Sequence, residues 1–205
     1  MPSEIQSQTH TTPHNIQHDL ICSIVEEGSK VLDLGCGEGD LLKRLKEQKG
    51  ITGAGVEVSE EKVYACIHKG LMAVHHGDID TGLADYPDKS FDYVILSETL
   101  QEIHKPALVI GEMLRVGKKG IVSFPNFGYW RARMQMFFLG RAPVTKSLPY
   151  EWYEGPNIQF LTIKDFTRLC SIKSYQIVQS VYFCHGKRIT FMPNLRANAA
   201  LFVLS

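Results

Sequence analysis

The 205-residue sequence has no long hydrophobic run and no excess of charge of either sign. A membrane-spanning helix needs about 20 consecutive apolar residues, and no stretch of the sequence approaches that length. The 22 basic and 22 acidic residues cancel, which removes the general electrostatic attraction that draws basic proteins to nucleic acid. We therefore expect neither a membrane nor a nucleic acid as a partner.

Cysteine is sparse and shows no metal-binding spacing. The five cysteines include no C-x-x-C pair and their number is odd, which argues against a disulfide scaffold and against a structural zinc site. The first 20 residues lack both the basic start and the apolar core of a signal peptide. The sequence thus predicts a cytoplasmic protein without a bound metal.

What the sequence does have is an alternation of apolar, strand-like segments with amphipathic, helix-like segments. This alternation predicts an α/β domain with a mostly parallel sheet and helices on both faces. Two final strands with no clear helix between them predict an antiparallel end. We expect residues 1–18 to form a flexible tail and residues 19–205 a single domain. The predicted strands cover 30–34, 51–58, 71–78, 91–97, 119–124, 174–184 and 198–205, and the predicted helices cover 39–48, 59–70, 106–117 and 162–172.

Three alternating glycines follow the first predicted strand, in the stretch VLDLGCGEGDLL. Gly35, Gly37 and Gly39 lie between a strand and a helix, which is where open parallel sheets bind their ligands. Glycine allows backbone angles closed to other residues, and the helix start offers free N–H groups. The spacing fits neither the G-x-G-x-x-G dinucleotide motif nor a P-loop. The loop alone therefore leaves a tight corner as the alternative to a ligand site.

Acidic residues close the next two predicted strands. Glu57 ends the second strand, where a carboxylate can accept hydrogen bonds from both hydroxyls of a ribose. Asp78 ends the third strand, where it could receive an adenine amino group. Each acid alone would be an ordinary cap or turn residue. Together, at the ends of successive strands, they predict a pocket for a nucleoside.

In combination these stretches resemble the class I S-adenosylmethionine-dependent methyltransferases, over about residues 28–124. The resemblance implies a Rossmann-like sheet of seven strands with a reversed last strand, and S-adenosylmethionine or S-adenosylhomocysteine as the cofactor. It implies that Glu57 holds the ribose and that Asp78 and Ile79 flank the adenine. The other implied cofactor contacts, most of them at the methionine end, are Asp33, Gly35, Cys36, Gly37, Gly39, Val58 and Ser97.

Longer stretches resemble the MetW family of methionine biosynthesis proteins. They include SETLQEIHKP, EMLRVGKKGIVSFPNFGYWRAR and GRAPVTKSLPYEWYEGPNI, and the resemblance extends over nearly all of the chain after the tail. It implies a role in methionine synthesis together with a homoserine O-acyltransferase as protein partner. Two functions stay open: an accessory protein that binds S-adenosylmethionine, and an active methyltransferase on a small-molecule substrate.

Residues 125–161 form an aromatic-rich insertion that is longer than an ordinary connection and holds both tryptophans. Aromatic residues and arginine are typical of interface cores. We expect four of them to contact a partner or a substrate: Arg133, Tyr150, Trp152 and Tyr153. An extension of the core and, less favoured by the neutral charge, a nucleic-acid platform are the alternatives.

No residue of the sequence stands out as a catalytic base. His104 follows the fourth predicted strand and is the one candidate, although a lone histidine beside a proline turn is more often structural. Methyl transfer needs a base only where the acceptor must lose a proton. Whether the protein is an enzyme therefore stays open at this point.

Overall fold

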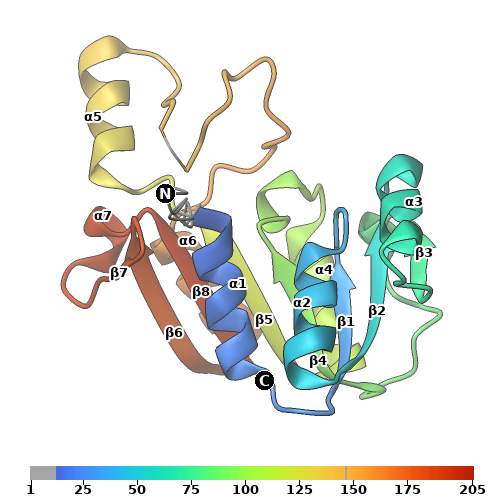
Figure 1. Ribbon diagram of the computed structural model, residues 1–205. Helices are drawn as coiled ribbons and strands as arrows, with labels where there is room; N and C mark the ends of the chain where they lie inside the picture. The colour runs from blue at the N-terminus through green and yellow to red at the C-terminus, as the bar shows by residue number, and fades with distance from the viewer. Residues whose placement is uncertain (1–12, 146) are drawn as a thin grey trace, which may run out of the picture.

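An eight-stranded sheet runs through the protein in the order β3-β2-β1-β4-β5-β8-β6-β7 (Figure 1). The computed structural model describes residues 13–145 and 147–205. The first five strands in this order are parallel, and β8 is antiparallel to both of its neighbours. The strands are β1 (Lys30–Leu34), β2 (Thr52–Glu57), β3 (Val74–His76), β4 (Phe91–Ser97), β5 (Gly117–Pro125), β6 (Ile177–Cys184), β7 (Lys187–Arg188) and β8 (Ala199–Leu204).

This arrangement confirms the predicted mostly parallel sheet with a reversed last strand. The implied number of seven strands is wrong by one, because the two-residue strand β7 pairs with the end of β6 and extends the edge of the sheet. So short a strand leaves no alternation of apolar and polar residues in the sequence by which it could be predicted.

Helices cover both faces of the sheet and bury one apolar cluster on each. One cluster joins α1, α2 and α3 to the sheet, and the other joins α4 and α6 to the opposite face. Side chains alternate along a strand, so Val31 of β1 enters the first cluster while Leu32 and Leu34 enter the second. The helices are α1 (Pro13–Ile24), α2 (Asp40–Lys49), α3 (Glu60–His68), α4 (Pro106–Val116), α5 (Trp130–Leu139), α6 (Ile163–Lys173) and α7 (Pro193–Arg196).

Helix α1 corrects the predicted boundary of the tail. It begins at Pro13, so residues 13–18 belong to a helix rather than to a flexible segment, and residues 1–12 lie outside the described residues. Proline is favourable at the first position of a helix, where its missing N–H would have no partner in any case. The helix is stabilised by packing, since Ile21, Cys22 and Val25 near its end are buried in the first cluster.

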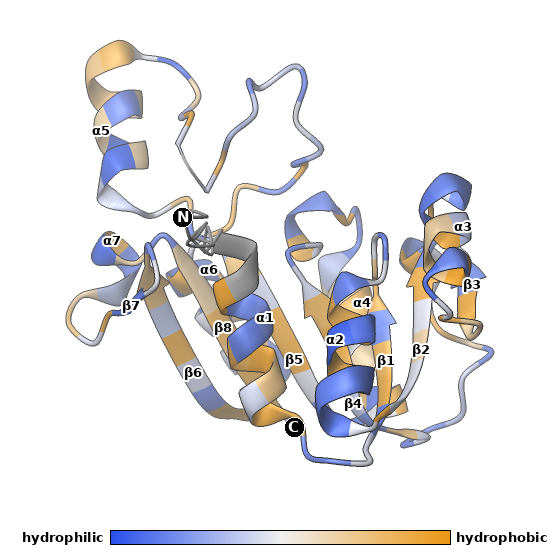
Figure 2. Cartoon of the chain, in the orientation of Figure 1, coloured by the Kyte–Doolittle hydropathy of each residue, from blue (hydrophilic) through white to orange (hydrophobic). Residues whose placement is uncertain are grey.

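The insertion at residues 125–161 carries α5, which stands away from the sheet at the upper left of Figure 1. Ala132 is the buried residue of this helix. The hydropathy colouring in Figure 2 shows apolar residues gathered toward the far end of α5, away from the sheet. This helix therefore exposes apolar surface that the described part of the chain leaves largely uncovered.

Among the described residues, the helices are all too short or too polar to pass through a bilayer.

Candidate functional site

The three glycines of the loop after β1 all have positive φ angles, but they serve different purposes. A Cβ atom added to Gly35 would lie 2.5 Å from the Thr99 side chain, and one added to Gly39 would lie 2.4 Å from Cδ1 of Leu71. Those two positions are glycine because the fold is tightly packed there. A Cβ at Gly37 would meet nothing within 4 Å. Gly37 is therefore the glycine whose backbone faces open space.

Glu57, the last residue of β2, holds the main chain of this loop. Its Oε2 accepts a hydrogen bond from the main-chain N–H of Gly37 at 2.8 Å, and its Oε1 accepts one from that of Ser59 at 3.0 Å. The residue is only 5% exposed. Each carboxylate oxygen has a second lone pair, so the group can still accept hydrogen bonds from a ligand.

A cavity of about 760 Å³ opens beside the glycine loop, at the carboxyl ends of β1, β2 and β4. This is the edge of an open parallel sheet where ligands bind. Asp78 caps a short 3₁₀ helix there, and His104 lies at the exposed rim with its Nδ1 3.3 Å from Oδ2 of Asp80. The sequence-predicted residues that line the cavity are Asp33, Gly35, Cys36, Gly37, Glu57, Val58, Asp78, Ile79, Ser97 and His104.

Gly39 is the one predicted cofactor residue that does not line this cavity. The prediction treated the three glycines as equivalent, but Gly39 packs against Leu71 and Cys66 at the start of α2. These partners lie about one helix and one strand further along the chain. Nothing in the spacing of the glycines could have shown this contact.

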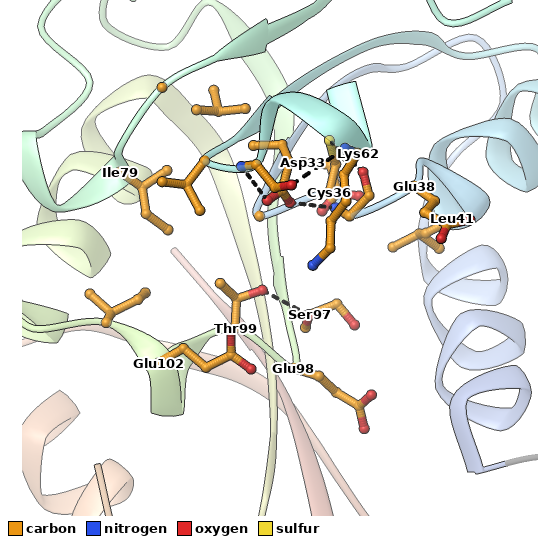
Figure 3. Close-up of a pocket in the computed structure, with 18 of the residues that line it drawn as sticks. Asp33, Cys36, Glu38, Leu41, Lys62, Ile79, Ser97, Glu98, Thr99 and Glu102 are labelled. Carbon is orange, nitrogen blue, oxygen red and sulfur yellow. Dashed lines mark hydrogen bonds between the residues drawn. The ribbon is translucent and has the colours of Figure 1, made fainter. Parts of the chain in front are cut away.

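Several lining residues were not singled out by the sequence. Glu98, Thr99 and Glu102 lie across the cavity from Asp33 and Cys36 in Figure 3. They belong to SETLQEIHKP, so the polar character of that stretch was the available signal. Lys62, one turn after Ser59 on α3, also lines the cavity. Its sequence context gave no signal of this, because a lysine in an amphipathic helix is ordinarily an exposed residue.

Carboxylates dominate the charge around the cavity. Burial, together with the nearby charge of Glu57, raises the pKa of Asp33 from 3.8 to about 7. Burial also raises the pKa of Glu102, which Lys62 partly offsets. The acidic lining residues are Asp33, Glu38, Asp40, Glu57, Asp78, Asp80, Glu98 and Glu102, against the single lysine Lys62 among the lining residues. The arrangement is suited to a ligand that carries positive charge.

The raised pKa of Asp33 predicts that the Asp33→Asn variant is more stable than the parent protein at alkaline pH. Between pH 4 and pH 7 the unfolded carboxyl is ionised while the folded one keeps its proton, so folding stability falls as pH rises. The advantage of the variant should grow over this range, to a few kcal/mol, and stay constant above it. Thermal unfolding of both proteins from pH 4 to pH 9 measures it. A constant difference at every pH would contradict the assignment.

The two cysteines near the loop are structural thiols. Burial raises the pKa of Cys36 and of Cys66, so both stay protonated and unreactive near neutral pH. The Cys66 thiol donates a hydrogen bond to the carbonyl of Gly37 at 3.2 Å. In residues 13–145 and 147–205, no three His, Cys, Asp or Glu side chains gather as a metal site would require.

The four residues predicted to contact a partner or substrate separate into two groups. Tyr150 lines a second cavity of about 660 Å³, which shares Lys62, Glu98 and Glu102 with the first. Trp152 and Tyr153 are exposed on the surface of the insertion. Arg133 of α5 donates from its Nε to the carbonyl of Gly128 at 2.6 Å, which fixes part of its side chain. Of the four residues, Tyr150 is thus the one that lines either of the two cavities described here.

Comparison with known proteins gives both a family and a fold. The family model "Methionine biosynthesis protein MetW" matches residues 15–204. A protein of Rhodopirellula baltica named bifunctional methionine biosynthesis protein MetXA/MetW is 36% identical over 200 residues, which are 91% of this chain and 32% of that protein. The chain therefore spans about a third of the length of that relative.

Solved structures of S-adenosylmethionine-dependent methyltransferases share the fold. One from Mesorhizobium loti superposes with a TM-score of 0.69 at 15% identity, covering 92% of this chain and 97% of that one. The [4+2]-cyclase SpnF superposes with a TM-score of 0.59 at 24% identity, covering 80% of this chain and 58% of that one. The chain thus has the class I methyltransferase fold, and the match over residues 15–204 shows that it belongs to the MetW family of methionine biosynthesis proteins.

Proposed function

We propose that this protein binds S-adenosylmethionine in the cavity beside the glycine loop and acts in methionine biosynthesis as the partner of a homoserine O-acyltransferase. The observation that carries the proposal is the buried carboxylate of Glu57, which is held by the N–H groups of Gly37 and Ser59 and lines the cavity. A carboxylate at the end of the second strand, beside a glycine loop, is suited to the hydroxyls of a ribose.

The remaining lining residues would contact different parts of S-adenosylmethionine. Val58, Asp78 and Ile79 would flank the adenine, and Gly37 leaves room for the ligand to approach the main chain. Asp33 and Ser97 would face the methionine end, where the ammonium group of the ligand is positive. When bound, S-adenosylmethionine supplies an activated methyl group on a positively charged sulfur.

The charge of the cavity favours S-adenosylmethionine over S-adenosylhomocysteine. The two ligands differ by a methyl group and by the positive charge on sulfur, and the lining is dominated by carboxylates. Opposite charges attract more strongly in a partly buried site than in water. A protein that distinguishes these two molecules could report the level of S-adenosylmethionine to the pathway that supplies its methionine.

The partner proposal is supported by the surface of the insertion. Phe137 of α5 is 81% exposed and Trp152 is 75% exposed, and exposed apolar groups of this size are typical of protein interfaces. The homologue named MetXA/MetW is a single chain about three times as long as the matched part, so a second protein can be joined to a MetW chain. The MetW resemblance implies that this second protein is a homoserine O-acyltransferase. Such a role would be carried out in the cytoplasm.

A second candidate function is methyl transfer to a small molecule. The observation that favours it is the second cavity, which shares Lys62, Glu98 and Glu102 with the first and so lies directly beside it. His104 is exposed at the rim of the first cavity, where its imidazole contacts the carboxylate of Asp80. It does not line the second cavity. It is therefore poorly placed to serve as a base for a molecule bound there.

Two measurements test the proposal and separate the candidates. Calorimetry of the purified protein should show S-adenosylmethionine binding more tightly than S-adenosylhomocysteine. The homoserine O-acyltransferase of the same cell should acylate homoserine at a different rate when this protein is added, and S-adenosylmethionine should change that effect. An unchanged rate, together with transfer of labelled methyl to a small molecule in a cell extract, would favour the second candidate.

A further inference from the structure

One segment of the chain both lines the first cavity and holds the insertion. This bridging segment, residues 98–104, follows directly after β4. Gln101, in its middle, does not line the first cavity and is only 5% exposed. Its neighbours in the segment do line that cavity, and they are Glu98, Thr99, Glu102, Ile103 and His104. The bridging segment therefore has one side at the cavity and another inside the protein.

The insertion is bound to the bridging segment by three hydrogen bonds. The main-chain carbonyl of Gln101 accepts from the N–H groups of Ile158 and Gln159, both at 2.8 Å. The side chain of Gln159 donates from Nε2 to the carbonyl of Ile103 at 3.3 Å. Trp152, an exposed aromatic residue of the surface proposed to meet the partner, lies shortly before Ile158 in the same insertion. A shift of the bridging segment would therefore be passed to the insertion through main-chain contacts.

The conformation of the bridging segment depends on its neighbours. Glu98 has a φ of +55°, in the left-handed region that is unfavourable for residues other than glycine. The residues after it form a single 3₁₀ turn, Leu100–Glu102, and so short a helix has little stability of its own. The main chain of Glu98 is held on both sides, because its N–H donates to the carbonyl of Ser123 at 3.0 Å and its carbonyl accepts from Nε2 of Gln101 at 2.5 Å.

A ligand in the first cavity would contact the bridging segment directly. Glu98 and Glu102 lie across this cavity from Asp33 in Figure 3, so a molecule between the two walls touches both. Their carboxylates attract the positive sulfur of S-adenosylmethionine, and more strongly in a partly buried site than in water. The ligand would thus restrict one side of a segment that holds the insertion on the other. Loss of conformational freedom is sufficient to couple two sites.

We propose that the bridging segment transmits the binding of S-adenosylmethionine to the insertion, and so regulates the surface that meets the partner. This rests on the proposed function, which supplies the ligand and the partner, and it adds the route between them. The route runs from Glu98 through Gln101 to the main chain of residues 158–159. Because coupling is reciprocal, a partner bound to the insertion should change the affinity for S-adenosylmethionine by the same factor.

Hydrogen exchange of the full chain, followed by NMR at single amides, measures this coupling. Saturating S-adenosylmethionine should slow exchange at Ile158 and Gln159 about 5-fold or more, the lower end of usual couplings between sites. The reference amide is Gly28, an exposed loop residue whose N–H donates to the carbonyl of Lys49 at 2.9 Å, and its exchange should not change. Unchanged exchange at Ile158 and Gln159 in the saturated protein would overturn the proposal.

Two variants interrupt the route without touching the first cavity. Gln101→Met has a side chain of similar length but lacks the donor to Glu98, and Gln159→Leu lacks the donor to Ile103. Neither residue lines the first cavity, so the affinity for S-adenosylmethionine should stay close to that of the parent protein. The slowing of exchange that the ligand causes should be smaller in both. If one variant fails to fold, the other decides.

The matched control is Gln135→Met, which removes a comparable amide from the insertion. The Gln135 side chain donates to the carbonyl of Val144 at 2.9 Å and accepts from its N–H at 2.8 Å, so both partners belong to the insertion. This variant should keep the full response at Ile158 and Gln159. A full response in Gln101→Met as well would refute the route.

Calorimetry on the same samples keeps this proposal separate from the proposed function. If S-adenosylmethionine does not bind, the proposed function falls and the coupling falls with it. If it binds while exchange in the insertion stays unchanged, the coupling alone is refuted and the binding stands. Slower exchange in the parent protein and in the Gln135 control, with a weaker response in the two route variants, would support the coupling.

Discussion

Replacing Glu57 with glutamine is expected to weaken the binding of S-adenosylmethionine about 100-fold. Glutamine has the same shape, but one of its two terminal atoms is an amide nitrogen that donates. That nitrogen would face the N–H of Gly37 or of Ser59, both of which also donate. Hydrogen bonds to a charged group contribute about 1.5–3 kcal/mol each, and 1.4 kcal/mol is a factor of ten in affinity. Isothermal titration calorimetry measures the change.

The matched control is Glu60→Gln, which makes the same chemical change three residues further along. Glu60 lies in the first turn of α3, is exposed and does not line the cavity. The affinity of the Glu60→Gln variant for S-adenosylmethionine should therefore stay within a factor of two of that of the parent protein. Thermal unfolding of both variants shows whether the loop still folds. A folded Glu57→Gln protein with the affinity of the parent would remove Glu57 from the binding site.

The second large effect is expected at α5. Replacing both Phe137 and Phe138 with serine should reduce the affinity for the homoserine O-acyltransferase at least 30-fold, because aromatic anchors at interface centres commonly contribute 2 kcal/mol or more. The two rings contact each other edge to face, with centroids 5.0 Å apart, and are 81% and 67% exposed. Their loss should leave the melting temperature nearly unchanged. Surface plasmon resonance with the purified acyltransferase gives the affinity.

The control for this pair is Ile172→Ser on α6. Ile172 is 67% exposed, the same fraction as Phe138, but it lies on a helix outside the insertion. It should have no effect on the affinity for the acyltransferase. If the α5 variant binds as well as the parent does, the docking surface lies elsewhere, while the result for Glu57 would still stand on its own.

The sequence predicted the sheet well because its strands are short apolar runs bounded by glycine or by acidic residues. The segments predicted at 30–34 and 91–97 match β1 and β4 residue for residue. Two of the predicted helices begin after residue types that are typical N-caps, serine and threonine. The side chain of Ser59 accepts from the N–H of Lys62 at the start of α3, and Thr162 forms a capping box with Asp165 at the start of α6.

The parts that sequence could not predict depend on contacts between distant segments. Helix α1 is polar at its start, and its first residues, from Pro13 on, fall within the segment that the sequence predicts as a flexible tail. Helix α5 buries Ala132 alone among its residues, so it has no apolar stripe of helical period to detect. The cavity residues Lys62 and Glu98 come from different elements and meet only in the folded chain.

Because Ala132 is the buried side chain of α5, the outward face of this helix can change without loss of folding stability. Selection for a stable domain and selection for a particular partner then act on different residues. If the proposed function holds, a MetW chain could follow a diverging partner by exchanging aromatic side chains on one helix, while the residues of the cavity beside the glycine loop stay constant. Recognition would be the rapidly evolving part of such a protein, and chemistry the slow one.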